Sequence, residues 1–322
     1  QTGQTLQVFD SNSAAIHIYG HNKHLCNDYL SNHIESLWKS KSCLFLLCQD
    51  CSLAYAWPFK AGDSLFYEKI YDKSKDYSKW SWEFQISFRR ISQICNHSDL
   101  STISLLEIGA GNGSFIKKVS KSIILPENIL TTEFSLHGKS EIEKLGIKCS
   151  SEDISSICMQ ENKEKFDFVC MFQVLEHLDN INTVFNALTF LLKQGGHLFI
   201  AVPNNYHREY FESIGINEDV PPIHISRWSK KSFLFLANKY NWKILNYEIE
   251  PNKFQKIISI YLKYRYKNSK IVNRLNNMQN KYFRIMVKSL IYTPLILLNI
   301  RGILSLRNEN LGISQWVEFQ KY

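Results

Sequence analysis

The chain has no uninterrupted apolar run of about 18 residues, the length that a membrane-spanning helix needs. Its first residues, QTGQTLQVFD, lack the basic region and the apolar core of a secretory signal. These two absences predict a cytoplasmic protein. Because the sequence begins at Gln1 without an initiator Met, an upstream targeting segment stays open. The 322 residues, 44% of them hydrophobic, exclude a disordered chain and suffice for one large domain or two modest ones.

Cysteine is present without the spacing of a small secreted disulfide scaffold. The eight cysteines stand at positions 26, 43, 48, 51, 95, 149, 158 and 170, several of them inside apolar runs. We expect reduced thiols, with a metal-binding role open for the pair Cys48 and Cys51.

Acidic residues are almost missing from one segment. Between Lys253 and Glu309 stand twelve Lys or Arg and one acid, whereas the rest of the chain carries 26 basic and 29 acidic residues. The net charge of +8 therefore comes from a separable basic segment on a mildly acidic protein. This distribution argues against a nucleic-acid surface spread over the whole molecule.

Residues 104 to 203 alternate short apolar runs with longer amphipathic stretches, which is typical of βαβ units around a parallel sheet. The predicted strands are 104–110, 128–135, a short one at 148–155, 166–173, 197–203, 243–250 and 314–321. Helices are expected over 75–95, 113–123, 136–146, 180–196 and 229–242, the fourth closed by Gly195-Gly196. The pattern predicts an α/β fold.

The strongest motif is Glu107-Ile-Gly109-Ala-Gly111-Asn-Gly113, between the first predicted strand and helix of this region. Glycines let the backbone turn tightly and approach a ligand, and the free amides of a helix N-terminus lie beside them. A dinucleotide fingerprint needs a glycine at position 114, where this chain has Ser114. The motif therefore counts against a nicotinamide-dependent oxidoreductase, with plain turn glycines as the alternative interpretation.

From this motif onward, residues 100 to 250 resemble the class I S-adenosylmethionine-dependent methyltransferases. Glu133 stands where the family binds the ribose hydroxyls, Asp153-Ile154 where it meets the adenine, and Phe172-Gln-Val-Leu-Glu-His177 where it borders the cofactor and the acceptor. Gly195-Gly196 and Pro203-Asn204 continue the pattern. The resemblance implies a doubly wound, Rossmann-like, seven-stranded sheet and an enzyme that uses S-adenosylmethionine.

The cofactor-binding residues that the resemblance implies are Glu107, Gly109, Gly111, Gly113, Glu133, Asp153, Ile154, Phe172 and Gln173. Simpler interpretations stay open for several of them. Glu133 can be a solvated loop acid, and Asp153 can cap a helix without meeting a ligand.

Two histidines are candidates for acid-base work on the acceptor. His224 lies in Pro221-Pro-Ile-His-Ile-Ser-Arg-Trp-Ser229, a segment that resembles one found in glycan and small-molecule methyltransferases, and His177 follows the fourth strand. Methyl transfer is an in-line displacement that needs a base mainly when the nucleophile is a hydroxyl. We predict His224 or His177 as that base, with a purely structural hydrogen-bonding role as the alternative. Tyr67, Tyr71 and Trp82 are further candidates for the pocket.

The Cys48-Gln-Asp-Cys51 segment resembles the second half of a zinc ribbon that precedes some class I methyltransferases. A complete site needs a second pair of ligands upstream, where the chain has His21-Asn-Lys-His24-Leu-Cys26. Cys48, Cys51, His21 and His24, or one histidine together with Cys26, are therefore the predicted zinc ligands. The alternative is a degenerate ribbon without metal.

We divide the chain into four predicted parts. Residues 1–63 form a cysteine-containing, ribbon-like module, 64–251 the methyltransferase domain, 252–312 a basic helical insertion and 313–322 the final strand of the sheet. In the insertion, apolar side chains recur at helical spacing at Ile271, Leu275, Met278, Tyr282 and Ile285.

The basic insertion has three interpretations. A lid or a homodimer arm is the first, and a surface for anionic partners is the second. The third is a peripheral membrane contact through 252–300, because SLIYTPLILLNI at 289–300 is apolar but too short, and broken by Pro294, to span a bilayer.

The predicted reaction is O-methylation of a sugar or natural-product hydroxyl, with a small-molecule or glycan acceptor. N- or C-methylation, or a noncatalytic binding module that keeps the fold, are the alternatives. A nucleic-acid substrate is disfavoured, because the Asn/Asp-Pro-Pro-aromatic segment of base-modifying members is replaced here by Gln173-Val-Leu-Glu-His177.

Overall fold

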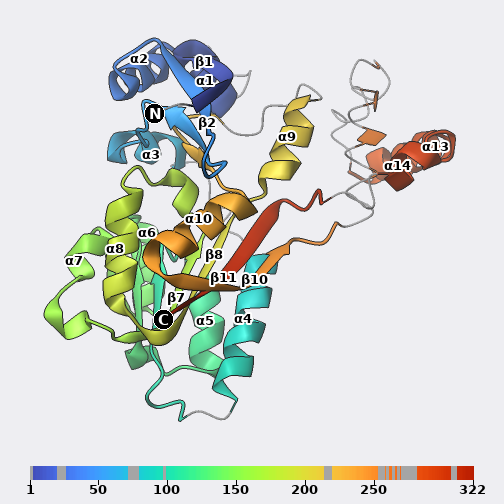
Figure 1. Cartoon of the computed structure of the whole chain (residues 1–322). Coiled ribbons are helices and arrows are strands. Elements are labelled where there is room, and N and C mark those ends of the chain that lie inside the picture. Colours follow the sequence, from blue (N-terminus) through green and yellow to red (C-terminus); the bar gives the residue numbers. More distant parts are fainter. Residues whose placement is uncertain are drawn as a thin grey trace. The chain divides into compact units, whose positions relative to one another are not determined.

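The computed structural model describes residues 3–19, 27–71, 80–96, 99–213, 220–252, 281–305 and 310–322, together with residues 258, 261–262, 265–266 and 269. The chain forms two compact units, drawn in Figure 1. The first comprises Gln1–Asn205, Glu218–Glu248 and Ser314–Tyr322, and the second comprises Tyr206–Asn217 and Ile249–Ile313.

The first unit is built on a seven-stranded sheet of order β10-β11-β8-β7-β4-β5-β6. Its strands are β4 (Leu105–Ile108), β5 (Ile129–Thr132), β6 (Lys148–Ser150), β7 (Phe166–Phe172), β8 (Leu192–Pro203), β10 (Trp242–Ile249) and β11 (Ser314–Lys321). Neighbouring strands from β6 to β8 pair in parallel, and β11 is antiparallel to β8. The predicted doubly wound, Rossmann-like α/β fold is thereby confirmed.

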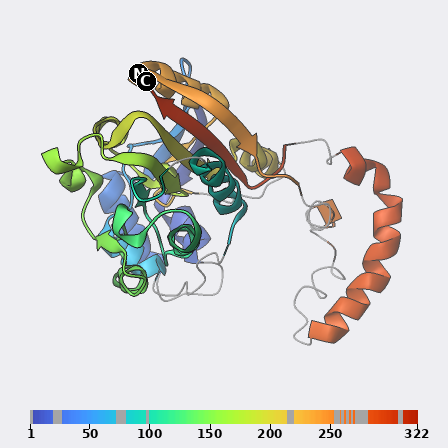
Figure 2. The same cartoon turned by 90° about the horizontal axis from the view of Figure 1, so that it is seen from below.

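Both faces of this sheet are buried, because alternate residues of each strand point to opposite sides. Leu105 and Phe168 face the helices α4 (Trp82–Cys95), α5 (Ser114–Ser122) and α6 (Leu136–Glu143). Leu106 and Val169 face α7 (Ile154–Ile157), α8 (Ile181–Leu191) and α10 (Lys230–Tyr240). Figure 2 shows helices on both sides of the sheet. The short 3-10 helices η1 (Pro126–Asn128), η2 (Gln160–Asn162) and η3 (Leu175–His177) lie in the connections.

One predicted helix end is wrong. Helix α8 ends at Leu191, and the pair Gly195-Gly196 lies inside β8. The reason is that Leu192 already pairs with Phe166 of β7, and Gly195, with φ of +75°, sits where the register between the two strands shifts.

A second, four-stranded antiparallel sheet has the order β1-β2-β3-β9. Its strands are β1 (Gly3–Asp10), β2 (Ser42–Cys48), β3 (Ala54–Trp57) and β9 (Ser226–Arg227), and the helices beside it in sequence are α1 (Ser11–Tyr19), α2 (Asn27–Trp38) and α3 (Ser64–Tyr71). Helix α2 buries Leu30, Ile34 and Trp38, which recur every four residues. Because β9 comes from far along the chain, its pairing with β3 fixes residues 220–228 beside the N-terminal hairpin.

The second unit contains α9 (Asn205–Ser213), α13 (Lys281–Leu298) and α14 (Ile300–Ser305). Leu311 packs there with Tyr210 and Tyr261. Helix α13 exposes Leu290, Leu297 and Leu298. No helix in the described part of the chain combines the length and the apolar character needed to cross a membrane. The lid, dimer and membrane-surface interpretations of the insertion stay predictions, and its positions 271 to 278 lie outside the described residues.

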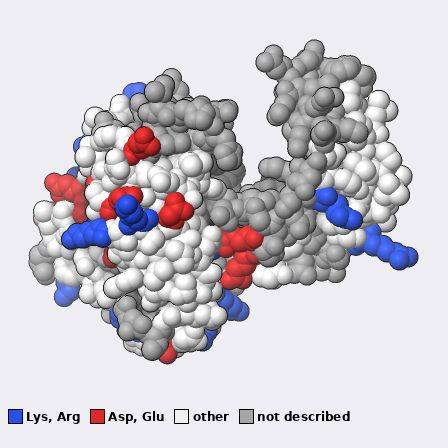
Figure 3. Space-filling view, turned by 90° about the horizontal axis from the view of Figure 1, so that it is seen from above, with Lys and Arg blue, Asp and Glu red and all other residues white. Residues whose placement is uncertain are grey.

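The described charges on the first unit do not gather into a patch of one sign on the face drawn in Figure 3. Lys and Arg side chains are interspersed there with Asp and Glu. The prediction that a nucleic acid is not the partner of this part of the chain stays a prediction.

Candidate active site

The glycine loop after β4 needs its glycines for backbone reasons. Gly109, Gly111 and Gly113 have φ of +68°, +57° and +73°, a region that other L-residues rarely adopt. A Cβ on Gly109 would lie 2.5 Å from Cγ2 of Val174, so the loops after β4 and β7 touch here. Gly113 is the N-cap of α5, whose first amides therefore open toward the same end of the sheet.

Glu133, directly after β5, ties two loops together. Its Oε2 accepts a hydrogen bond from the Gly111 amide at 2.8 Å and its Oε1 accepts one from the Ser135 amide at 2.8 Å. Ser135 in turn caps α6 by accepting from the Gly138 amide. The carboxylate of Glu133 is therefore held by two backbone amides, although the residue is only partly buried. Each of its carboxylate oxygens keeps lone-pair capacity for a further donor, such as a ribose hydroxyl.

Gly138 belongs to this arrangement and was not predicted from the sequence. A Cβ at this position would lie 2.4 Å from the carbonyl oxygen of Gly111 and 2.8 Å from Cγ of Glu133. Only glycine lets the first turn of α6 approach the glycine loop so closely. The signal was a glycine three residues after a helix-capping serine.

Glu107 carries a buried carboxyl group on β4, 2% exposed. Burial raises its pKa well above the ordinary value, and the charge of Glu133 raises it further. Its Oε2 has no hydrogen-bond partner among the described residues. A buried acceptor without a partner is costly in a folded protein, so this oxygen is suited to a ligand group.

Asp153 and Ile154 follow β6. Oδ1 of Asp153 accepts from the Ser155 amide at 2.9 Å and makes Asp153 the N-cap of α7, while Ile154 is buried. The capping interpretation of Asp153 thus has direct geometric support. Its contact with an adenine stays a prediction.

Phe172 and Gln173 end β7. The Phe172 ring is buried against Phe84 and Phe115, with ring centroids 5.2 Å and 4.9 Å away. Gln173 has φ of +55°, and its Nε2 donates to Oγ of Ser314 at 3.3 Å. Phe172 thus packs in the core between the sheet and α4 and α5, while Gln173 links the loop after β7 to the start of β11.

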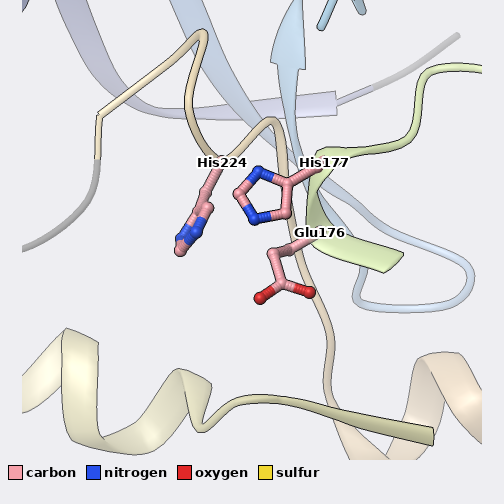
Figure 4. A group of neighbouring side chains, drawn as sticks. All are labelled: Glu176, His177 and His224. Carbon is pink, nitrogen blue, oxygen red and sulfur yellow. The ribbon is translucent and has the colours of Figure 1, made fainter. Parts of the chain in front are cut away.

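His177 and His224, 47 positions apart in the sequence, meet in space (Figure 4). Their ring centroids are 4.5 Å apart in an edge-to-face arrangement. Nδ1 of His177 lies 2.6 Å from the carbonyl oxygen of Ile223, and the Ile225 amide donates to the carbonyl oxygen of Glu176. The loop after β7 is therefore bound directly to the segment that carries His224.

The aromatic candidates differ in their positions. The Tyr67 hydroxyl lies 3.3 Å from Nδ1 of His177, so Tyr67 of α3 joins the histidine pair. Trp82 packs against the core formed with α4 and α5. The side chain of Tyr71 lies outside the described part of the chain.

The site occupies the C-terminal ends of β4, β5 and β7. The chain runs from β4 to β6 in one direction across the sheet and then returns to β7 on the other side of β4. Ligands of open α/β sheets bind where the strand order reverses in this way. The glycine loop and the loop of His177 flank that point.

The second predicted site, the pair Cys48 and Cys51, lies at the turn of the β2–β3 hairpin. A hydrogen bond from the Cys51 backbone lowers the pKa of the Cys48 thiol, whereas burial raises the pKa of Cys51. Within the described residues no third His, Cys or carboxylate completes a metal site with this pair. The predicted partners His21, His24 and Cys26 lie outside the described residues, so zinc binding stays a prediction.

A family model described as a methyltransferase domain matches residues 82–247, half of the chain. The chain belongs to the class I S-adenosylmethionine-dependent methyltransferases. Its cofactor is accordingly S-adenosylmethionine, as predicted, and the match spans β4 to β8 and most of β10 in the large sheet.

Curated relatives of this methyltransferase are ubiquinone biosynthesis O-methyltransferases. The one from Pelagibacter ubique is 28% identical over 141 residues, which cover 41% of this chain and 56% of that protein. The mitochondrial one from Dictyostelium discoideum is 25% identical over 137 residues, 39% of this chain and 43% of that protein. The chain thus spans about half the length of the curated relatives it matches.

Solved structures with a similar fold include a SAM-dependent methyltransferase from Archaeoglobus fulgidus. It is 13% identical, with a TM-score of 0.47 over 80% of this chain and 98% of that chain. Phosphoethanolamine N-methyltransferase 2 from Haemonchus contortus, solved with S-adenosyl-L-methionine, is also 13% identical, with a TM-score of 0.46 over 79% of this chain and 60% of that chain.

The residues at the methyltransferase site fit the chemical groups of S-adenosylmethionine. Glu133 has acceptor capacity for hydroxyl groups such as those of ribose, and Oε2 of Glu107, which is buried without a hydrogen-bond partner among the described residues, would be free to bind a further ligand group. The glycine loop leaves room for a close approach of the ligand, since no Cβ lies there except that of Ala110 and Asn112.

Proposed function

We propose that this methyltransferase transfers the methyl group of S-adenosylmethionine to a hydroxyl oxygen of a small molecule, a sugar or another natural product. The observation that carries the proposal is the apposition of His177 and His224 beside the loops that flank the cofactor position. Glu107, the three glycines, Glu133, Asp153, Ile154, Phe172 and Gln173 are proposed to hold the cofactor.

A hydroxyl is the acceptor for which this arrangement is suited. A neutral hydroxyl is a weak nucleophile toward a sulfonium methyl group, and it must lose its proton as the bond to carbon forms. Imidazole titrates near neutral pH and accepts such a proton. Two imidazoles at the acceptor side of the site therefore favour oxygen over a carbon acceptor, which needs a stronger base.

The curated relatives support the same acceptor atom, since both are named as O-methyltransferases. The stretches shared with these two relatives cover 39% and 41% of this chain. The sugar or natural-product skeleton is therefore our proposal, and so is the division into a ribbon-like module at 1–63, a methyltransferase domain at 64–251 completed by 313–322, and an insertion at 252–312.

The test is methyl transfer from labelled S-adenosylmethionine to a panel of phenols, sugars and amines, with products identified by mass spectrometry. We expect methylated hydroxyls and a loss of kcat of about 10²-fold or more in His224→Ala. His17→Ala, at an exposed histidine of α1, is the matched control. Methylation of amines alone would contradict the proposal. Normal binding of S-adenosylhomocysteine with no turnover on any acceptor would favour the binding module.

A further inference from the structure

We propose that Glu176, His177 and His224 bind one divalent transition-metal cation, and that this cation holds and acidifies the acceptor hydroxyl. The role in catalysis rests on the proposed O-methylation, whereas cation binding does not depend on it. The three residues converge from the loop after β7 and from the segment before β9 (Figure 4).

The three side chains are close enough to share an ion. One ligand atom from each residue lies within 4.8 Å of the others. Ligands at about 2.0–2.2 Å from a common metal are themselves roughly 3–4 Å apart. The remaining difference is within reach of side-chain rotation. The described residues contain no other group of three such ligands.

The hydrogen bonding of His177 prepares it as a ligand. A carbonyl oxygen only accepts, so Nδ1 of His177 carries the hydrogen in its 2.6 Å bond to Ile223. In the neutral ring the lone pair is then on Nε2, the nitrogen that faces Glu176 in Figure 4. A metal-binding histidine commonly donates its other N–H to a backbone carbonyl in this way, which fixes the tautomer and the ring orientation.

The ligand set selects the class of metal. Two imidazoles and one carboxylate suit zinc, manganese, iron(II) or cobalt, whereas magnesium and calcium prefer oxygen ligands alone. Glu176 is buried, 1% exposed, and a buried carboxylate beside two imidazoles is well matched to a cation. Three protein ligands leave coordination positions open for an acceptor.

The cation gives the hydroxyl proton a route that does not require a free imidazole. When an acceptor hydroxyl binds the cation its pKa falls, and the proton leaves to solvent water. The oxygen lone pair then attacks the methyl carbon, the bond between that carbon and sulfur breaks, and its electron pair stays on the sulfur of S-adenosylhomocysteine. The products are the methyl ether and neutral S-adenosylhomocysteine.

The test begins with binding rather than with activity. The 322-residue chain carrying Cys48→Ser and Cys51→Ser, which removes the thiol pair of the predicted zinc site, is stripped with a chelator and titrated calorimetrically with Mn²⁺, Zn²⁺ and, as a hard-cation control, Mg²⁺. We expect one equivalent of Mn²⁺ or Zn²⁺ per chain and weak or no binding of Mg²⁺. Co²⁺ loaded at the same site is expected to show the visible absorption bands of nitrogen coordination.

Ligand variants locate the site. Glu176→Gln keeps the shape of the buried side chain, and we expect it and His224→Ala to weaken cation binding at least about tenfold. His17→Ala, at an exposed histidine of α1, is expected to bind as the parent does. All of these proteins are expected to keep their affinity for S-adenosylhomocysteine, which shows that they are folded.

Two results would overturn the inference. In the first, the chain binds S-adenosylhomocysteine normally but does not bind Mn²⁺ or Zn²⁺, or binds them with an affinity that Glu176→Gln and His224→Ala leave unchanged. The other is hydroxyl methylation at full rate by the chelator-treated chain, which would return the histidines to the role of free bases. A failure of the proposed O-methylation is seen separately, as cation binding at these three residues without turnover.

Discussion

The single side chain of Glu133 binds the glycine loop and is also proposed to bind the ligand. Its carboxylate accepts from the amides of Gly111 and Ser135. We predict that Glu133→Ala lowers the affinity for S-adenosylhomocysteine by about tenfold to a hundredfold, because a hydrogen bond to a charged group contributes about 1.5–3 kcal/mol. Isothermal titration calorimetry measures this change, with NAD as the control ligand.

Glu152→Ala is the matched control for this prediction, since Glu152 is an exposed acid two residues beyond β6. It is expected to bind as the parent chain does. An unchanged affinity in Glu133→Ala, with an intact circular dichroism spectrum, would remove Glu133 from the cofactor site.

Alanine variants of two glycines with positive φ distinguish the energetic cost of backbone strain from the cost of close packing. Gly109 has φ of +68°, and a methyl group added to it would lie 2.5 Å from Val174, whereas Gly195 has φ of +75° and no atom within 4 Å of such a methyl group. We predict that Gly195→Ala lowers the free energy of unfolding by about 1–2 kcal/mol through strain alone. Gly109→Ala is expected to lose about 1–3 kcal/mol more through overpacking.

Urea denaturation measures both values. Adding Val174→Ala to Gly109→Ala is expected to recover the packing part and leave the strain. Equal losses in the two single variants would show that the contact between the loops after β4 and β7 carries no energetic cost.

At the scale of elements, Glu318 of β11 links its strand to three neighbouring elements, the helix α4 and the strands β8 and β10. Its carboxylate accepts from Arg90 of α4, His197 of β8 and Asn246 of β10. Burial by itself raises the pKa of Glu318, but these hydrogen bonds outweigh it and lower the pKa to about 2.

A lowered folded-state pKa means that the stabilisation is present above the unfolded value of 4.5 and is lost as the pH falls toward 2. We predict that the chain loses up to about 3 kcal/mol through this carboxylate over that range. Glu318→Gln is expected to be less stable at pH 7 and to show a shallower loss in acid. Urea titrations at several pH values measure these stabilities, with Glu161→Gln, at an exposed glutamate, as the control. Parallel pH profiles of stability for the parent and Glu318→Gln would contradict the prediction.

The strands of the large sheet were predictable because each is a short apolar run bounded by polar residues. Both faces of the sheet are covered, so β7, with the sequence FDFVCMF, is a nearly continuous apolar run whose short length indicates a strand. Neither the N-terminal sheet nor helix α2 was predicted, although the helical spacing of Leu30, Ile34 and Trp38 is a signal for α2. Strand β9 has two residues, too few for any periodicity, and it forms only because β3 offers an edge.

The residues proposed for the cofactor side of the site could be named from the sequence for the same local reason, since glycines and acids stand at fixed positions after strands. The cluster of Glu176, His177 and His224 was not, although both histidines were predicted individually. Their proximity depends on the pairing of β9 with β3 and on the bond between His177 and Ile223. Asp153 shows a different limit of prediction from sequence. An aspartate at this position serves equally as a helix cap or as an adenine contact, so the motif does not distinguish the two roles.

At the scale of the whole molecule, the proposed cofactor residues all belong to the first unit, while α13 and α14 belong to the second. Ligand binding stabilises the segments that hold the ligand, by about 2.7 kcal/mol at a hundredfold excess over Kd. We predict that S-adenosylhomocysteine slows hydrogen exchange at 109–113 and 133–138, as measured by mass spectrometry, and that NAD does not.

The same experiment decides between the interpretations of the insertion. A lid that closes over the site requires added protection at 281–305 when S-adenosylhomocysteine binds, because the amides there would become less accessible only in the liganded state. A dimer arm requires protection at 281–305 that grows with protein concentration and is independent of the ligand. We expect one of these two patterns. Protection confined to 109–113 and 133–138 at every protein concentration would contradict both and leave the exposed leucines of α13 to the membrane-surface interpretation.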